Sequence, residues 1–145
     1  MKIYNRRIRR DYQILEKFEA GVSLLGWEVK SLKDGRASLD EAHVRIKNNQ
    51  AWLFNAFIHP YQFSDVKTID PRRTRKLLLH KKEILNLEQK VKQKKLTIVP
   101  IAWYNKGNLI KLQAVLVRSK REFEKKETIK RKDLDREIEQ EMKGH

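Results

Sequence analysis

The chain has 145 residues, with 34 Lys and Arg against 19 Asp and Glu, a net charge of +15 and no cysteine. This length allows one domain with a modest core, and the lack of cysteine excludes disulfides and thiolate metal sites. The sequence contains no apolar run of the length of a membrane span and no secretory signal after Met1, so we expect a cytoplasmic protein whose basic charge favours nucleic acid over a membrane as its partner.

The first ten residues hold five Lys and Arg and no acidic residue, which predicts a basic leader over residues 1–11. The arginines in it are Arg6, Arg7, Arg9 and Arg10. A guanidinium group offers phosphate a planar pair of donors that an ammonium group lacks. A leader of this kind can be a disordered solubilising segment, but its arginine density favours an RNA contact.

Two elements are expected next. Residues 12–18 are aromatic and aliphatic enough for a strand, and residues 27–32 fit a short helix or a bent strand closed by a turn at Asp34-Gly35. A hairpin follows, because residues 43–46 and 51–54 alternate between apolar and polar side chains. Residues 47–50 between them contain two asparagines, which tolerate the positive φ of tight turns.

A loop is expected over residues 63–73 and a helix over about 75–95. Leu77, Ile84 and Val91 lie seven residues apart and form one apolar stripe of that helix. Residues 67–95 hold eleven basic and three acidic residues, the second block of positive charge. Arg75 and Lys76 open the helical part of this block and are candidate RNA-binding residues.

A second hairpin is predicted from residues 96–104 and 109–117, with its turn at residues 105–108. Pro100 implies an edge strand or a bulge in the first arm. Five or six antiparallel strands with one inserted helix predict a mainly β fold. We expect an OB-fold-like antiparallel Greek-key barrel over residues 12–117 with flanking helices, a common architecture among nucleic-acid binders.

The last 28 residues, 118–145, form a charged tail with ten basic and eight acidic residues but few large apolar ones. Glu122 and Lys126, like Glu139 and Lys143, are spaced for ion pairs along a helix. A helix with so little to bury is marginal alone and is often ordered only by a partner. Its net charge of +2 is small, so it is not the main RNA-binding surface.

Aromatic residues among the basic ones could stack on unpaired bases. Tyr12 and Trp27 lie near the basic leader and are the better candidates, while Trp52 and Trp103 are expected in the core. The sequence contains no metal-ligand set, phosphate loop or activated nucleophile, which argues against an enzyme and predicts neither metal nor cofactor. Glu19 fits an acceptor for a base amino group better than a catalytic acid.

Several motifs resemble one family, small protein B, the SsrA-binding proteins of bacterial trans-translation. They are Phe18-Glu19-Ala20-Gly21, the run Gly26-Trp27-Glu28-Val29-Lys30-Ser31-Leu32, Asp70-Pro71, and Arg73 to Leu79 followed by Glu83-Ile84. The hairpins and the charged tail follow in the order expected of that family, so the resemblance covers nearly the whole chain.

The resemblance implies an OB-type barrel and a non-enzymatic adaptor. Such an adaptor binds the tRNA-like domain of transfer-messenger RNA and delivers it to stalled ribosomes, with elongation factor Tu as a further partner and the protein as a monomer. Its tail is implied to enter the empty mRNA channel and to fold there as a helix. The tail residues implied at the decoding centre are Lys120, Arg121, Phe123, Glu124, Lys125 and Lys126.

The resemblance places the RNA face on Asn5, Arg6, Tyr12, Glu19, Leu78 and Lys111. Charge and aromatic character add Arg7, Arg10, Trp27, His43, Arg75 and Lys76 to the predicted interface. Three positions depart from the family pattern: Arg10 stands where a His is frequent, His43 where a Tyr is frequent, and Phe123 where the tail often has His or Tyr.

Two alternatives remain open from the sequence. An OB-type ribosomal or initiation protein would be a permanent component of the ribosome, and it would remain on washed ribosomes of unstressed cells. A catalytic RNA-processing protein would change RNA ends in the presence of a divalent metal. The adaptor predicts instead that one stable RNA with a tRNA-like end accompanies the protein.

Overall fold

The computed structural model describes residues 1–61 and 69–119 of the protein. Its three helices in these ranges are α1 (Ile8–Asp11), α2 (Gly26–Lys33) and α3 (Lys81–Lys94). The first strands are β1 (Lys2–Tyr4), β2 (Tyr12–Val22), β3 (Ala37–Ser38), β4 (His43–Lys47), β5 (Gln50–Phe54) and β6 (Phe57–Ile58). They are followed by β7 (Arg75–Leu78), β8 (Thr97–Lys106) and β9 (Leu109–Ser119).

The main sheet closes on itself as an antiparallel barrel. Its strand order is β8-β4-β5-β7-β2-β9, and β9 pairs again with β8, while β1 adds to β8 from outside this ring. A small second sheet joins β3 to β6. The mainly β, OB-like barrel with flanking helices that the sequence predicts is therefore confirmed.

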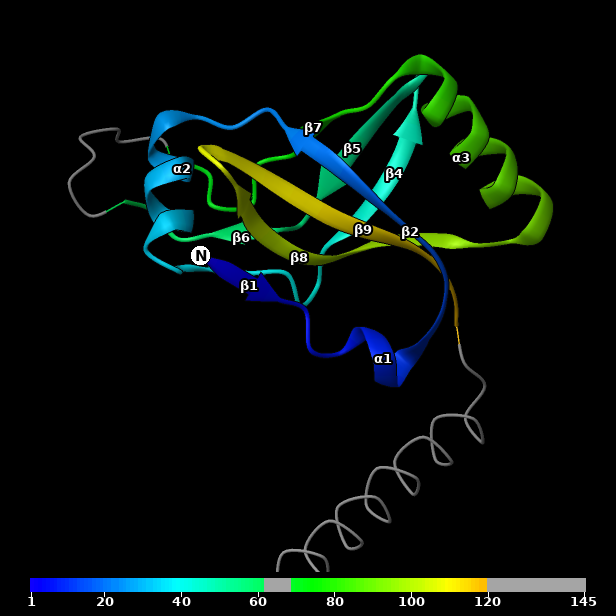
Figure 1. Ribbon diagram of the computed structural model, residues 1–145, viewed down its shortest axis with the longest axis horizontal. Helices are drawn as coiled ribbons and strands as arrows, with labels where there is room; N and C mark the ends of the chain where they lie inside the picture. The colour runs from blue at the N-terminus through cyan, green and yellow to red at the C-terminus, as the bar shows by residue number, and fades with distance from the viewer. Residues whose placement is uncertain (62–68, 120–145) are drawn as a thin grey trace, which may run out of the picture.

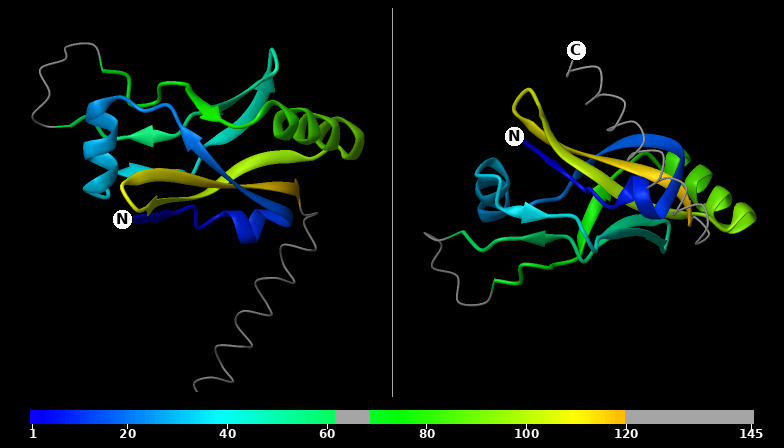
Figure 2. Two further views of the ribbon diagram at one scale, coloured as in Figure 1. Left: turned by 45° about the horizontal axis from the view of Figure 1, so that its top comes forward. Right: turned by 90° about the horizontal axis from the view of Figure 1, so that it is seen from below.

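The helices lie around the barrel and not within it. In Figure 1, α2 lies at one end, α3 lies at the opposite side, and α1 lies below the strands that it connects. The two further views in Figure 2 keep α2 and α3 apart on either side of the sheet. The broad outer surface of β2, β9 and β8 lies between them.

The barrel core is filled by aliphatic side chains around Trp103, which is fully buried. Inward residues alternate along the strands, as Ala51 and Leu53 do on β5, whereas Trp52 between them points outward and remains half-buried. The prediction of Trp103 as core is confirmed, and the same prediction for Trp52 is wrong. Its indole Nε1 lies on the outside, 3.4 Å from the carbonyl oxygen of Lys47.

Several local predictions are confirmed by the structure. The strand predicted over residues 12–18 is β2, which extends to Val22. Residues 27–32 form a helix and not a bent strand, and Gly35 turns the chain with φ +72°. Pro100 lies at a bulge in β8, where the register against β9 shifts. The hairpin of β4 and β5 turns through Asn48 and Asn49, with φ of 54° and 60°.

The β4–β5 turn gives a direct test of backbone strain. Replacing Asn49 by Ala should lower the free energy of unfolding by about 1 kcal/mol, because a Cβ without a polar group is disfavoured at positive φ. Replacing it by Gly should change stability by less than about 0.5 kcal/mol, since Gly accepts this φ without strain. Urea denaturation of the three proteins measures both changes. Equal stability of the Ala and Gly variants would contradict a cost of positive φ at this turn.

The helix expected over residues 75–95 is shorter than predicted. Residues 75–78 form β7, which pairs with β5 on one side and β2 on the other, and the helix begins only at Lys81. The apolar stripe included Leu77, but that side chain is buried in the barrel core as a strand residue. Residues 75–78 are strand because their backbone hydrogen bonds join β5 to β2 and close the barrel. Those partner strands are remote in sequence, so the local helical spacing gave no sign of them.

The predicted leader of residues 1–11 contributes two elements to the fold. β1 pairs with β8 through Lys2, Ile3 and Tyr4. Ile8 of α1 is buried in a small apolar cluster with Val99, Val115 and Val117 on the outside of β8 and β9. β9 ends at Ser119, so the first two residues of the predicted tail belong to the barrel.

Candidate nucleic-acid interface

Sheet register brings three predicted RNA-binding residues onto one outer face. Gly21 on β2 lies between Leu78 on β7 and Lys111 on β9, and Lys111 in turn lies beside Tyr104 on β8. The neighbouring row two residues away on β2 places Glu19 beside Gln113, which lies beside Ala102. Residues two apart on a strand share a face, so Glu19, Leu78 and Lys111 lie on the same surface.

Glu19 is the acidic centre of this face. Its Oε2 accepts a hydrogen bond from the hydroxyl of Tyr104, and its Oε1 lies 3.3 Å from Nζ of Lys106. The hydrogen bond from Tyr104 lowers the pKa of Glu19, and Lys106 and Lys111 lower it further. Burial and the bond to Glu19 raise the pKa of Tyr104 to about 12. At neutral pH the pair is therefore a carboxylate with a neutral phenol donor.

The surface beside Glu19 is open and apolar at Leu78, whose exposed fraction is 56%. Gly21 has no side chain to cover it, and a Cβ there would lie 3.4 Å from Cβ of Leu78. This strip thus presents an exposed aliphatic side chain and a lysine side by side, the kinds of group that contact bases and phosphates in nucleic-acid interfaces.

Other predicted residues lie on the outer surface but apart from this centre. Arg6, Arg7 and Arg10 are exposed around α1. Tyr12 and Trp27, predicted to stack on bases, are half-buried and pack against apolar clusters of the protein itself. His43 stacks on Phe54 of the paired strand, with ring centres 5.5 Å apart. Burial and the charge of Arg45 lower the pKa of His43, so its ring is neutral at pH 7.

Two predicted residues are held inside the protein. Arg75 is fully buried, and its guanidinium group binds Glu28, the carbonyl of Ala56 and the carbonyl of Pro71. Asn5 is also buried, and its amide donates to the carbonyls of Leu39 and Pro100. Neither side chain is available to RNA, so these two predictions do not fit the structure. Arg75 was predicted at the surface because it stands among other basic residues. Its buried partner Glu28 is remote in sequence, so the arginine-rich stretch could not reveal the ion pair.

The buried carboxylate of Glu28 binds two arginines and one backbone N–H group. Its Oε1 lies 2.6 Å from the guanidinium of Arg73 and 2.7 Å from the backbone nitrogen of Leu25, while Oε2 lies 2.5 Å from Nε of Arg75. The carboxylate thus joins the start of α2 to β7 and the segment before it. This joint fixes the strand that carries Leu78.

Three surface residues near Glu19 were not predicted as RNA contacts. Tyr4, Tyr104 and Lys106 come from β1 and β8, which are remote from Glu19 in sequence. Nothing in the local sequence around these three residues places them beside Glu19. Only the pairing of β1, β8 and β9 brings them together.

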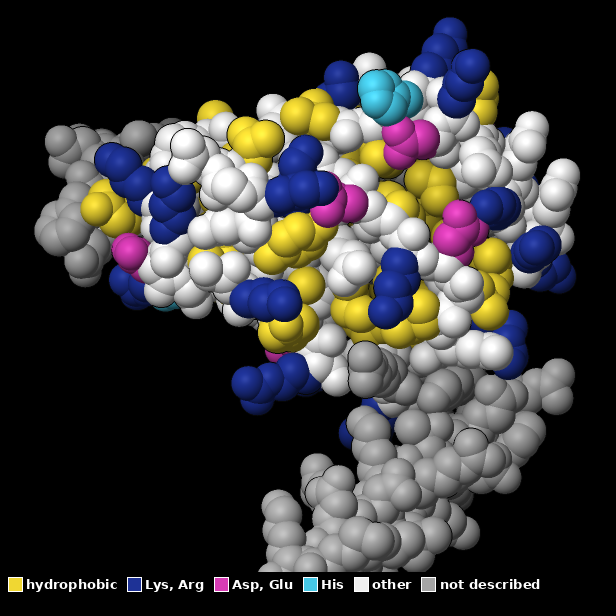
Figure 3. Space-filling view, in the orientation of Figure 1, with side chains coloured by type: hydrophobic (Ala, Val, Ile, Leu, Met, Phe, Trp, Pro, Cys, Tyr) yellow, Lys and Arg dark blue, Asp and Glu magenta, His cyan; other side chains and the backbone are white. Residues whose placement is uncertain are grey.

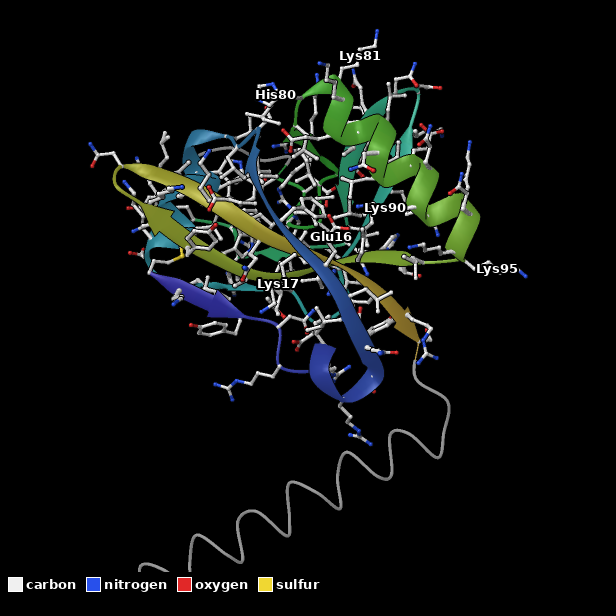
Figure 4. The ribbon with its side chains drawn as sticks, turned by 45° about the vertical axis from the view of Figure 1, so that its right-hand side comes forward. Glu16, Lys17, His80, Lys81, Lys90 and Lys95 are labelled. Atoms are coloured by element: carbon white, nitrogen blue, oxygen red, sulfur yellow. The ribbon has the colours of Figure 1, made fainter. Side chains whose placement is uncertain are left out.

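Basic side chains are distributed over this side of the molecule and alternate with exposed apolar groups (Figure 3). Figure 4 shows Lys81 at the start of α3, Lys95 just past its end and Lys90 facing β2. Nζ of Lys90 lies 2.6 Å from Oε2 of Glu16, an ion pair that ties α3 to the barrel. Lys76 lies on β7, half-buried beside Trp52. The second basic block is thus partly used for internal contacts.

Within residues 1–61 and 69–119, no cluster of three or more His, Cys, Asp or Glu residues could hold a metal ion. Over the same ranges no helix is long and apolar enough to cross a membrane. The predicted tail residues at the decoding centre, Lys120, Arg121, Phe123, Glu124, Lys125 and Lys126, lie outside the described residues.

Comparison with known proteins identifies the family of this chain. The family model described as SmpB protein matches residues 2–144. The chain belongs to the SmpB family. The resemblance carried by the sequence motifs around Glu19, Trp27 and Leu78 is therefore confirmed.

SmpB-family relatives match over almost their whole length. An SsrA-binding protein of Sulfurihydrogenibium sp. is 49% identical over 140 residues, which cover 97% of this chain and 92% of the relative. One from Chlorobaculum tepidum is 45% identical, with 95% of this chain and 88% of the relative covered. A solved chain from a study described as "tmRNA-SmpB: a journey to the center of the bacterial ribosome" is 42% identical, with a TM-score of 0.70 and coverage of 88% and 94%.

Proposed function

We propose that this SmpB-family chain is an RNA-binding adaptor of trans-translation. It binds the tRNA-like domain of transfer-messenger RNA, or SsrA RNA, and delivers it to stalled ribosomes, where the nascent chain is tagged for proteolysis. The names of its relatives as SsrA-binding proteins support the RNA partner, and the ribosome complex in which a similar chain was solved supports the second partner.

The observation that carries the proposal is the meeting of Glu19, Leu78 and Lys111 on one outer face of the barrel. A carboxylate accepts from base amino groups, a lysine binds phosphate, and an exposed leucine packs on a base or sugar. The exposed arginines around α1 add positive charge that attracts the RNA backbone. Lys76 lies two residues before Leu78 on β7 and so shares this face, whereas Trp27 packs on the core from α2 and His43 lies on β4 across the barrel.

The adaptor performs no chemistry on the RNA and works as a monomer in the cytoplasm, where ribosomes are. Elongation factor Tu joins it in the delivery complex. The tail beyond Ser119 is the ribosome-probing part, and its residues Lys120, Arg121, Phe123, Glu124, Lys125 and Lys126 contact the decoding centre. RNA affinity and ribosome recognition are thereby assigned to different parts of the chain.

Purification from bacterial cells under mild conditions tests the partner directly. We expect one stable RNA with a tRNA-like 3′ end to accompany the protein and to exceed ribosomal RNA in the eluate. Stoichiometric retention on salt-washed ribosomes without this RNA would favour a permanent ribosomal protein instead. Altered RNA ends after incubation with a divalent metal would favour an RNA-processing enzyme.

The salt dependence of RNA binding tests the proposed contacts between basic side chains and phosphates. If about four basic residues contact phosphates, raising salt from about 50 to 200 mM should lower affinity for the tRNA-like domain by roughly 100-fold. Replacing Arg6 by Gln should reduce the slope of log K against log salt by about one. Lys33→Gln, at the exposed end of α2, is the matched control and should leave the slope unchanged. An unchanged slope for the Arg6 variant would remove the leader from the interface.

A further inference from the structure

The end of β9, from which residues 120–145 continue, is held by the start of β2. Ser119, the last residue of β9, lies opposite Tyr12, and Arg118 lies opposite Gln13. Nε of Arg118 donates a hydrogen bond of 3.0 Å to Oε1 of Gln13, and its Nη2 donates to the same oxygen. The pairing of β9 with β8 starts only at Val117, so in the described structure Arg118 and Ser119 pair with β2 alone. These two residues are the root of the tail.

Helix α1 packs on the outside of the same strand end. Its Ile8 is 3% exposed and shares one apolar cluster with Val99, Val115 and Val117. Val115 and Val117 lie two residues apart on β9 and therefore face the same side of the sheet. This cluster is separate from the barrel core, and its last member directly precedes the root of the tail. Burial of these side chains stabilises the contact more than one exposed hydrogen bond does.

The chain before α1 is fixed as well, by the buried side chain of Asn5. Its Nδ2 donates to the carbonyl oxygens of Leu39, at 2.9 Å, and Pro100, at 3.2 Å. Its Oδ1 accepts a hydrogen bond from the backbone nitrogen of Arg7. Its own backbone N–H donates to the carbonyl oxygen of Ile101 on β8. The path of the chain into α1 therefore starts from a fixed point on the barrel.

Residues 5–13 thus form a bracket around the end of β9. The bracket is anchored to the barrel by Asn5, to the outer face of β9 by Ile8 and to the root of the tail by Gln13. A tilt at the root displaces every residue beyond it, and the displacement grows with distance along the tail. A firmly held root limits the space that the tail explores, which lowers the entropy lost when a partner orders the tail.

We propose that this bracket sets the direction in which the tail leaves the barrel, and that this direction is needed for tagging on stalled ribosomes. Ile8 and Gln13 are positioning residues, because they act on β9 and through it on the tail. The same segment carries the exposed arginines predicted to contact RNA, so one element serves both parts of the protein. The inference rests on the proposed function, because that function assigns the tail to the ribosome.

A distance measurement on the free protein tests the hold on the root. The chain has no cysteine, so Ser119→Cys and Lys33→Cys give two exposed positions for spin labels. We expect a narrow distribution of the distance between the labels, and Ile8→Ala should make it about twice as wide. Leu87→Ala is the matched control, because it removes as many carbons from a buried position on α3, and it should keep the wild-type width. Ile8→Val, with a smaller broadening expected, replaces Ile8→Ala if that variant does not fold.

Tagging kinetics at saturating protein test the consequence on the ribosome. Gln13→Ala keeps the net charge and should lower the maximal tagging rate about threefold, the worth of one hydrogen bond. Affinity for the tRNA-like domain should change by less than about twofold, since no basic residue is lost. Arg118→Gln alone should also lower the rate, whereas Gln13→Arg combined with Arg118→Gln rebuilds the pair in exchanged order and should restore it. A general loss of stability would not be reversed by this exchange.

The outcomes distinguish failure of the bracket from failure of the proposed function. If the wild-type protein neither binds the tRNA-like domain nor supports tagging, the proposed function is wrong and the role of the bracket falls with it. If the wild type is active but Ile8→Ala leaves the label distance as narrow as Leu87→Ala does, only the bracket is wrong. A broadened distance with an unchanged maximal tagging rate would overturn the need for a fixed direction. An exchange variant as slow as the single variants would overturn the positioning role of Gln13.

Discussion

Replacing Glu28 by Ala should destabilise the protein by about 3–5 kcal/mol, because it breaks a buried ion pair and leaves one charge behind. The substitution leaves the guanidinium of Arg75 fully buried without the carboxylate of Glu28, and it also removes the ion-pair partner of Arg73. Such a loss is a large fraction of the stability of a typical domain. Urea denaturation of the full chain, followed by circular dichroism, measures it.

A surface ion pair supplies the control for Glu28. Glu41 lies 3.8 Å from Arg72 with its side chain 64% exposed, so Glu41→Ala should cost no more than about 1 kcal/mol. Similar losses for the two variants would contradict the assignment of Glu28 as the joint between α2 and β7. Because this joint fixes the strand that carries Leu78, RNA affinity at a temperature where the variant is folded should also fall.

The carboxylate of Glu28 should also make the free energy of unfolding depend on pH in the acid range. Burial raises the pKa of Glu28, but the hydrogen bonds from Arg73 and Leu25 and the charge of Arg75 outweigh burial, so its pKa lies below the ordinary 4.5. A group whose pKa is lowered by folding stabilises the folded state above its unfolded pKa. The contribution of Glu28 is therefore complete above about pH 4.5 and is lost as pH falls through the lower folded value. Glu28→Gln should remove this part of the pH dependence.

Ending the chain after Ser119 should abolish tagging of nascent chains on stalled ribosomes while changing affinity for the tRNA-like domain by no more than about threefold. The removed residues 120–145 hold nine basic and eight acidic residues, so their net charge is only +1. Loss of one net charge has a small effect on RNA affinity if, as proposed, the phosphate contacts come from the barrel and α1. Filter binding and a translation assay on a message without a stop codon measure the two activities.

The single change Phe123→Ala refines the truncation test. It should spare RNA affinity and lower tagging, because Phe123 is the tail aromatic proposed to stack at the decoding centre. Lys143→Ala near the end of the chain is a comparison that should leave tagging closer to the wild-type level. If truncation destroyed RNA binding, the separation of an RNA-binding barrel from a ribosome-probing tail would be wrong.

The positions of the hairpins could be read from the sequence because their signals are local. Alternation along residues 43–46 and 51–54 and the asparagines between them determine a turn with no help from the rest of the chain. The motifs around Glu19 and Trp27 likewise identified the SmpB family, since a family pattern is a property of the sequence itself. Net charge and its concentration in two blocks indicated a polyanionic partner for the same reason.

The role of Arg75 and the start of α3 could not be read from the sequence. Leu77 and Ile84 have helical spacing, but Leu77 belongs to a strand whose hydrogen bonds close the barrel between β5 and β2. Arg75 stands among basic residues and is nevertheless buried, because Glu28 from a distant helix neutralises it. Both outcomes depend on partners remote in sequence, which local spacing and composition do not encode.

By itself, the sequence determined the family, the hairpins, the basic character and the presence of Glu19, Leu78 and Lys111. Only the tertiary structure decided that these three share a face and that Tyr104 and Lys106 orient Glu19. The physical reason is that a strand's side chains meet neighbours set by register, and register between β2, β9 and β8 is fixed by closure of the whole barrel.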